Sequence, residues 1–288
     1  MTELPENVRR LAELISPCTL CPRQCLVDRS GGQVGRCRIG PEAVVVSAGP
    51  HFGEEPVLVG RGGSGTIFLA GCNLDCVFCQ NADISHSAEG RRMQGGQIAA
   101  IALGLQRGGC ENVNFVTPTH VAHVVAEAIA LARAGGLTVP VVYNCGGYES
   151  LQTLRLLEGL VEIYMPDFKY AHAEAGRKYS GAGDYPAVAA AALEEMYRQV
   201  GPLRLDEARR ATRGVLVRHL VMPGDLAGSR RVIDTVARLA PGAALNVMAQ
   251  YRPCFRAQEF PELNARPESA EVRSLQSLAQ RRGLTRPE

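Results

Sequence analysis

The sequence predicts an α/β protein in which a small cysteine-rich N-terminal module precedes an incomplete parallel barrel of six βα units. Residues 1–60 are rich in Cys, Gly, Pro and Arg and lack a sustained hydrophobic period, whereas residues 61–288 alternate short apolar runs with longer helical patterns. Polar residues also interrupt one face of the expected strands, most clearly at Asn114, Arg218 and Gln250. A closed, packed barrel would carry branched apolar side chains there, so we expect a lumen that binds a ligand.

The individual elements follow from runs of apolar residues and their spacing. The expected strands are 66–72, 112–117, 138–144, 161–166, 214–222 and 244–250. The expected helices are 7–15, 95–107, 119–134, 149–158, 185–200, 229–239 and 268–282. Six βα units are too few to close an eight-stranded barrel, so the barrel should stay open on one side. We therefore expect a metal-binding module over 1–60 and a partial barrel with a C-terminal helix over 61–288.

Composition narrows the class of protein. The chain has 288 residues, 46% of them hydrophobic, which is enough for a sizeable core. A net charge of +2 gives no strong field for nucleic acid or an acidic membrane surface. No apolar run reaches the roughly 18 residues of a membrane span, and the start MTELPENVRR does not resemble a signal peptide. These features predict a cytoplasmic protein without nucleic-acid or membrane partners.

The ten cysteines indicate metal binding. They occur in tight groups, and without an export signal no oxidising compartment favours disulfides. Seven of them precede residue 80, while Cys110, Cys145 and Cys254 are scattered and are expected to be small core residues.

One group follows the first expected strand directly. The segment GCNLDCVFCQN places Cys72, Cys76 and Cys79 at CxxxCxxC spacing. Because active sites of parallel βα barrels lie at the carboxyl ends of the strands, this loop would bring all three thiols to the mouth of the barrel. Three thiolates can hold three irons of a 4Fe-4S cluster and leave the fourth iron free for a small molecule, whereas an electron-transfer ferredoxin would use a fourth cysteine.

The other group is a quartet in the N-terminal module, Cys18, Cys21, Cys25 and Cys37. Four thiolates would close a site, which favours a structural zinc ion or an auxiliary 4Fe-4S cluster over a second catalytic centre. The spacing does not decide between the two metals, and unligated thiols are the third interpretation.

The CxxxCxxC motif, with the aromatic Phe78 before its last cysteine, resembles that of the radical S-adenosylmethionine (SAM) superfamily. Over residues 18–265 the chain is most similar to uncharacterised relatives of pyruvate formate-lyase activating enzyme. The segments that carry this resemblance are CTLCPRQC, GEEPVLVGRGGSGTIFLAGCNLDCVFCQN, NVNFVTPTH, VYNCGGYE, VEIYMPDFKY, VRHLVMPG and MAQYRP. The resemblance implies a partial barrel of radical SAM type and a 4Fe-4S cluster that binds SAM. Reductive cleavage of SAM then gives a 5'-deoxyadenosyl radical, which abstracts hydrogen from a substrate.

The resemblance also implies residues that contact SAM. The segment with Thr117 and Thr119 stands where activating enzymes use a Gly-Gly-Glu turn to meet the SAM amino group, and this chain departs from that turn. Asn144 and Gly146 correspond to the turn after the third strand.

Three charged residues correspond to further positions near SAM. Asp167 and Lys169 match an Asp-x-Lys near the ribose and the methionyl part, and Arg218 matches a strand arginine that could pair with the SAM carboxylate. A surface ion pair is the alternative for Asp167 and Lys169. No catalytic acid or base is assignable.

The family implies an electron donor such as flavodoxin or ferredoxin. The substrate is open between a protein, such as a glycyl radical enzyme, and a small molecule or peptide. A non-catalytic iron-sulfur or zinc scaffold, or an electron-transfer protein, is the alternative function.

Overall fold

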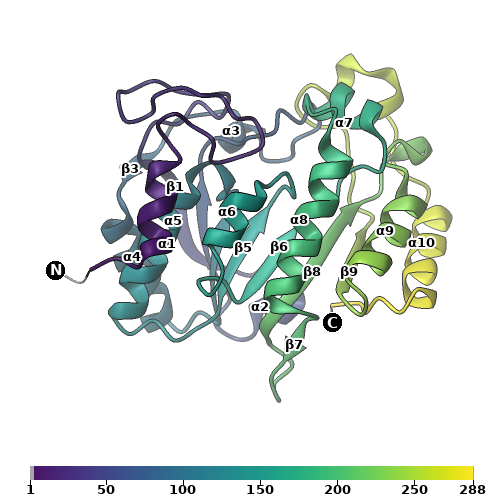
Figure 1. The fold of residues 1–288 in the computed structure, drawn as a ribbon. Helices are drawn as coiled ribbons and strands as arrows, with labels where there is room; N and C mark the ends of the chain where they lie inside the picture. Colours follow the sequence, from purple (N-terminus) through teal and green to yellow (C-terminus); the bar gives the residue numbers. More distant parts are fainter. Residues whose placement is uncertain (1–2, 288) are drawn as a thin grey trace.

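The computed structural model describes residues 3–287, which form an α/β fold around one mixed, mostly parallel sheet (Figure 1). Its strands are β1 (Ala43–His51), β2 (Ser64–Leu69), β3 (Arg91–Met93), β4 (Val113–Val116), β5 (Val141–Cys145), β6 (Ile163–Pro166), β7 (Arg204–Leu205), β8 (Ala211–Leu220) and β9 (Ala244–Met248). Within residues 3–287 the nine strands have the order β3-β1-β2-β4-β5-β6-β8-β7, with β9 on β8, and the sheet does not close.

Six of these strands run parallel to one another. They are β2, β4, β5, β6, β8 and β9, and they correspond to the six expected runs, shifted by a few residues at their ends. The long β8 pairs with three strands: its first half pairs with β6 and, antiparallel, with the short β7, and its residues Leu216 to Leu220 pair with β9. The prediction of six parallel strands in an open sheet is confirmed.

The α-helices of the described residues are α1 (Glu6–Glu13), α2 (Pro56–Val59), α3 (Ala82–Ser85), α4 (Gly95–Arg107), α5 (Ala122–Ala134), α6 (Leu151–Leu156), α7 (Ala173–Ser180), α8 (Tyr185–Val200), α9 (Ser229–Leu239) and α10 (Ser269–Arg281). The longer helices cover the outer face of the sheet (Figure 1), whereas α2 packs on its inner face. Neighbouring helices contact one another in the order α4, α5, α1, α6, α8, α9, α10. The N-terminal α1 therefore lies in the outer layer between α5 and the short α6.

Residues 1–60 do not form one uniform piece of structure. Residues 19–42 contain neither helix nor strand, whereas β1 pairs antiparallel with β2 and extends the main sheet. The strand β1 was not expected, because Gly49 and Pro50 interrupt its apolar run. The proposed division at residue 60 stays a prediction.

The interior of the curved sheet is layered. The lowest layer is apolar: Val57 and Leu58 of α2 pack against residues near the starts of the parallel strands, such as Val142, Ile163 and Ala244. Polar side chains stand further along the strands than these apolar ones. Side chains two residues apart share a face of a strand, so these polar side chains face the same interior. They are Asn114, Asn144, Arg218 and Asn246. The strands therefore hold a polar layer above an apolar floor.

Candidate functional site

A cavity of about 260 Å³ lies at the carboxyl ends of the parallel strands. The loop after β2 covers it, and the ends of β4, β5, β6, β8 and β9 form its walls. Its lining residues are Cys72, Leu74, Cys76, Phe78, Cys79, Gln80, Asn81, Ser85, Val116, Thr117, Asn144, Cys145, Gly146, Asp167, Lys169, Arg218, Leu220, Met222, Met248 and Gln250. The wall therefore combines four thiols with several charged and amide side chains.

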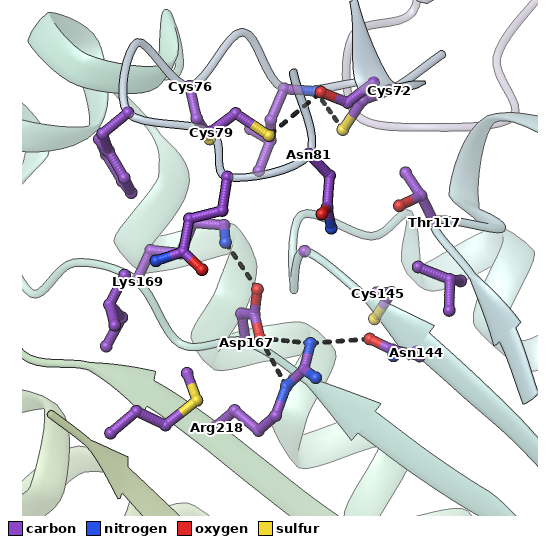
Figure 2. A pocket seen from close by; sticks show the side chains of 18 of the residues that line it. Cys72, Cys76, Cys79, Asn81, Thr117, Asn144, Cys145, Asp167, Lys169 and Arg218 are labelled. Atoms are coloured by element: carbon purple, nitrogen blue, oxygen red, sulfur yellow. Dashed lines mark hydrogen bonds and ion pairs between the residues drawn. The ribbon is translucent and has the colours of Figure 1, made fainter. Parts of the chain in front are cut away.

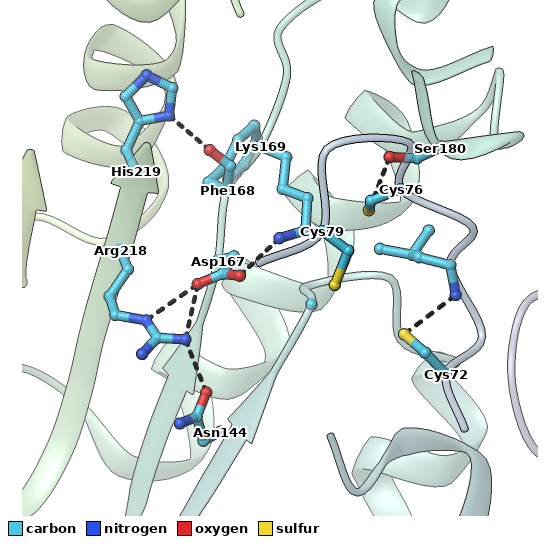
Figure 3. Close-up of polar contacts among 12 residues, drawn as sticks. Cys72, Cys76, Cys79, Asn144, Asp167, Phe168, Lys169, Ser180, Arg218 and His219 are labelled. Carbon is cyan, nitrogen blue, oxygen red and sulfur yellow. Dashed lines mark hydrogen bonds and ion pairs between the residues drawn. The ribbon is translucent and has the colours of Figure 1, made fainter. Parts of the chain in front are cut away.

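The three cysteines of the first motif each have a polar partner, drawn for Cys72 and Cys76 in Figure 3 and for Cys79 in Figure 2. The Cys76 Sγ lies 2.9 Å from the Ser180 hydroxyl, and the Cys79 Sγ lies 3.1 Å from the Ser85 hydroxyl. The Cys72 Sγ accepts a hydrogen bond from the backbone N–H of Leu74 at 3.3 Å. In this arrangement the sulfurs turn towards different partners, and nowhere in residues 3–287 do three cysteine, histidine or carboxylate side chains converge closely enough to hold a metal ion.

The chemistry of this donor set nevertheless fits a thiolate-bound iron centre. Burial raises the pKa of the Cys72 and Cys76 thiols, and the positive charge of Lys169 opposes this rise at both. A metal with affinity for soft ligands would displace these thiol protons. The nearby donor groups, the Leu74 N–H and the two serine hydroxyls, would then stabilise sulfur anions.

A charged network lies on the opposite side of the cavity (Figure 2). Asp167, directly after β6, accepts hydrogen bonds from Lys169 Nζ at 2.6 Å and from Arg218 Nε at 3.0 Å. Burial favours the neutral form of Asp167, but the two cations outweigh it and hold the pKa of this carboxyl below its usual range. Asp167 is therefore an anion held between two cations, and the pair with Lys169 is not a free surface ion pair.

The polar layer below holds Arg218 in place. Arg218 Nη2 donates to the Asn144 side-chain oxygen at 2.8 Å. The Asn144 amide donates in turn to Glu54 at 3.2 Å, and the Asn114 amide donates to the same oxygen at 3.0 Å. Glu54 also forms an ion pair with Arg218 at 3.4 Å. These contacts fix the orientation of both the guanidinium and the Asn144 amide.

Two turns bring the backbone close to the cavity. Gly147 has φ +76°, and a Cβ there would lie 2.1 Å from the Asp167 carbonyl oxygen, so only glycine fits. Thr117 adopts φ +61°, which is uncommon for a threonine, and its N–H donates to the Asn144 carbonyl oxygen at 2.8 Å. Strained backbone of this kind occurs often at ligand sites.

The structure brings most of the sequence-predicted residues together. Cys72, Cys76, Cys79, Thr117, Asn144, Gly146, Asp167, Lys169 and Arg218 all line the cavity. Thr119 lies outside the lining, since its buried hydroxyl donates to Glu149 at 2.6 Å. The quartet of Cys18, Cys21, Cys25 and Cys37 also lies outside it, in the N-terminal segment.

Sequence reasoning missed three residues of this region, Glu54, Asn81 and Cys145. Asn81 is the last residue of the segment CVFCQN. Its side chain extends from the cysteine loop into the cavity (Figure 2). Glu54 belongs to the segment GEEP, but it precedes the first expected strand, so no strand pattern placed it in the lumen. Cys145 is a buried core residue, as expected, and what the sequence did not indicate is that it also lines the cavity.

Glu149 is a buried carboxyl group next to the cavity-lining residue Cys145, and its pKa gives a testable consequence of this burial. It is 2% exposed, accepts hydrogen bonds from Thr119 and Tyr143, and lies beside Cys145. Burial raises its pKa to about 7, against the opposing effect of these hydrogen bonds. The folded protein therefore binds a proton that the unfolded chain has released, and stability should fall as pH rises from about 4.5 to about 7.

We expect Glu149→Gln to remove this decrease, because glutamine carries no charge at any pH. Urea denaturation between pH 4.5 and 7.5 measures it, with Glu127→Gln as the control variant. A decrease of the same size in Glu149→Gln and in the unaltered protein would contradict the assignment.

Comparisons with known proteins add one relative. No family model matches the chain. A protein of Methanocaldococcus jannaschii described as uncharacterised is 32% identical over 274 residues, which cover 93% of this chain and 75% of that protein. No helix within residues 3–287 is long and apolar enough to cross a membrane. The extent and identity of the match show that the chain belongs to the same family as this uncharacterised archaeal protein.

Proposed function

We propose that this protein is a radical SAM enzyme in which Cys72, Cys76 and Cys79 hold a 4Fe-4S cluster at the mouth of a partial barrel. The observation that carries the proposal is the position of the three thiols, which line the same cavity as Asp167, Lys169 and Arg218. A scaffold that only stores or transfers metal has no need for fixed charged and amide groups facing its cysteines. When bound, the cluster supplies the electron that cleaves the sulfonium of SAM.

The protein's own residues bind and orient the cosubstrate. SAM carries a carboxylate, an ammonium and a ribose, and the cavity offers a guanidinium, a carboxylate and several amides. Arg218 is suited to the SAM carboxylate through its planar donors, and Asp167 and Lys169 are suited to the ribose and the methionyl part. Asn144, Gly146 and Thr117 line the same wall, and Thr119 supports it through Glu149.

Such an enzyme acts mainly by positioning. The cavity has to hold SAM beside one C–H bond of a substrate and exclude other hydrogen donors. The apolar residues Leu220, Met222 and Met248 on the wall of β8 and β9 serve the second need. We expect a reduced flavodoxin or ferredoxin as electron donor, a cytoplasmic setting, and as substrate a glycyl radical enzyme, a peptide or a small molecule.

The proposal is tested by cleavage of SAM. The protein is reconstituted anaerobically with iron and sulfide, reduced with dithionite and incubated with SAM, and 5'-deoxyadenosine is measured by chromatography. We expect 5'-deoxyadenosine from the reconstituted protein and none from protein without iron. Four bound irons per chain without any 5'-deoxyadenosine, also in the presence of candidate substrates, would favour the non-catalytic scaffold.

Arg218→Lys tests the role of the guanidinium. Lysine keeps the charge but loses the planar donors that contact Asp167 and Asn144. Since a hydrogen bond to a charged group contributes about 1.5–3 kcal/mol, we expect SAM to bind roughly ten- to hundredfold more weakly. Equilibrium dialysis of the iron-loaded protein measures the Kd.

Arg213→Lys is the matched control for this variant. Arg213 lies on the same strand, is exposed, and donates to the Gln199 carbonyl oxygen outside the cavity. Equal losses of SAM affinity in the two variants would remove Arg218 from the proposed site.

A further inference from the structure

Arg29 is a buried cation in the N-terminal segment. Its side chain is 1% exposed, and its donors contact the carbonyl oxygens of Gly40 and His120. Nη1 also lies 3.9 Å from the Cys18 Sγ. None of the ion pairs formed within residues 3–287 includes Arg29. A buried charge without a counter-charge costs several kcal/mol, so an anionic group is expected beside it.

Cysteines close to Arg29 could supply this negative charge, beginning with Cys18. The backbone N–H of Cys18 donates to the Val27 carbonyl oxygen at 2.9 Å, which places Cys18 beside the residues that follow Cys25. The Cys25 Sγ accepts a hydrogen bond from the Arg36 N–H at 3.4 Å, which brings in the segment before Cys37. These contacts gather the segments that carry Cys18, Cys25 and Cys37 around one region.

Cys21 belongs to the same group. Burial raises the pKa of the Cys21 thiol to about 12, and the nearby Cys37 and Cys18 add to the rise. Cys18, Cys21 and Cys37 are all buried, at 7–8% exposure. Three buried thiols and the half-buried Cys25 therefore lie near a buried cation that has no carboxylate partner within residues 3–287.

The backbone of this segment also needs something to hold it. Residues 19–42 contain neither helix nor strand, yet Gln24, Leu26 and Arg38 adopt φ values of +41°, +56° and +67°. Such conformations cost about 1–2 kcal/mol each for a residue other than glycine, and they persist only where the surroundings enforce them. A metal ion bound by residues on both sides of these positions would enforce them.

We propose that Cys18, Cys21, Cys25 and Cys37 bind one structural zinc ion as four thiolates. A zinc ion with four thiolates carries a net charge of −2, and Arg29 would neutralise part of it. The CxxC pair of Cys18 and Cys21 and a closed set of four thiolates suit tetrahedral zinc. A zinc ion requires four sulfurs at about 2.3 Å from one centre and no further inorganic atoms. Because the four sulfurs do not converge in this structure, binding requires rotation of cysteine side chains.

The zinc site would act on the loop that carries Cys72, Cys76 and Cys79. Arg23 donates to the Asn73 carbonyl oxygen at 2.7 Å, and Arg36 forms an ion pair with Asp75 at 2.6 Å. The Cys37 carbonyl oxygen would lie 2.6 Å from a Cβ on Gly71, so the two segments touch immediately before Cys72. The N-terminal segment therefore supports this loop from outside the cavity.

The experiment measures metal content in the full chain and does not depend on SAM chemistry. A variant with alanine at Cys72, Cys76 and Cys79 lacks the first cysteine group and retains the quartet as its only group of closely spaced cysteines. We expect about one zinc per chain in this variant, in the unaltered protein and in the control Cys110→Ala, and zinc close to zero in Cys18→Ser/Cys21→Ser. Loss of zinc from the alanine variant, or its retention in the serine variant, would refute the quartet.

A spectroscopic measurement covers the case in which the serine variant does not fold. Cobalt(II) added to the zinc-free alanine variant should give the visible absorption of a tetrahedral cobalt thiolate, with four sulfurs by X-ray absorption. Absence of this absorption would overturn the proposal. Iron reconstitution is the remaining arm: about eight irons per chain in the unaltered protein and about four in the serine variant would assign the quartet to a second cluster.

Discussion

Alanine in place of Cys76 should abolish the formation of 5'-deoxyadenosine from SAM. Two remaining thiolates do not hold three irons of a cube, so the cluster is not retained. The Cys76 side chain is buried and, within residues 3–287, its sulfur hydrogen-bonds only with the Ser180 hydroxyl, so its removal should leave the fold intact. Chromatography of reaction mixtures after anaerobic reconstitution measures the product, and circular dichroism checks the fold.

Cys110→Ala is the control for this change. Cys110 is similarly buried, at 4% exposure, but it lies before β4 at the opposite end of the strand from the cavity. This variant should form 5'-deoxyadenosine at the rate of the unaltered protein. If Cys76→Ala remained active, the proposed cluster site would be wrong.

Alanine in place of Asp167 should lower the free energy of unfolding by about 3 kcal/mol. Asp167 is the common partner of Lys169 and Arg218, whose side chains are each only 19% exposed. Removing Asp167 takes away the carboxylate that pairs with Lys169 and leaves Arg218 with Glu54, which is far more destabilising in a largely buried network than the loss of a surface pair. Urea denaturation at neutral pH measures the effect.

Asp234→Ala provides the comparison, because Asp234 forms an ion pair with Arg282 in which both side chains are more than 40% exposed. Such pairs contribute about 0–1 kcal/mol. Similar losses of stability in the two variants would show that Asp167 also behaves as a surface carboxylate. A decrease confined to Asp167→Ala supports the network as the element that orders the cavity wall.

The parallel strands and their helices could be predicted because their signals are local. Helices α4, α8 and α9 span the predicted ranges, since each shows a regular apolar face over at least 11 residues. The four-residue α2 and α3 and the two-residue β7 are too short to show such a period. Tertiary contacts stabilise these short elements, as when Val57 and Leu58 of α2 pack on the inner face of the sheet.

The candidate site likewise contains residues that strand positions predict and residues that only tertiary contacts place. The cysteines, Asp167 and Lys169 follow expected strands directly, so strand order alone places them at one end of the sheet. Glu54 reaches the lumen from a segment between β1 and α2, and its contacts with Asn114, Asn144 and Arg218 join residues far apart in sequence. A pattern in the sequence gives no distance between such residues, so this part of the site required the structure.

The apolar floor formed by Val57 and Leu58 determines how molecules exchange with the cavity. Because α2 packs below the polar layer, a molecule bound against Arg218 and Asn144 does not exchange through the starts of the strands. Exchange takes place at the carboxyl ends, where the cysteine loop lies, or along the side that the unclosed sheet leaves open. A molecule bound deepest among those that enter at the carboxyl ends lies behind the others, so the floor favours an order of binding and release.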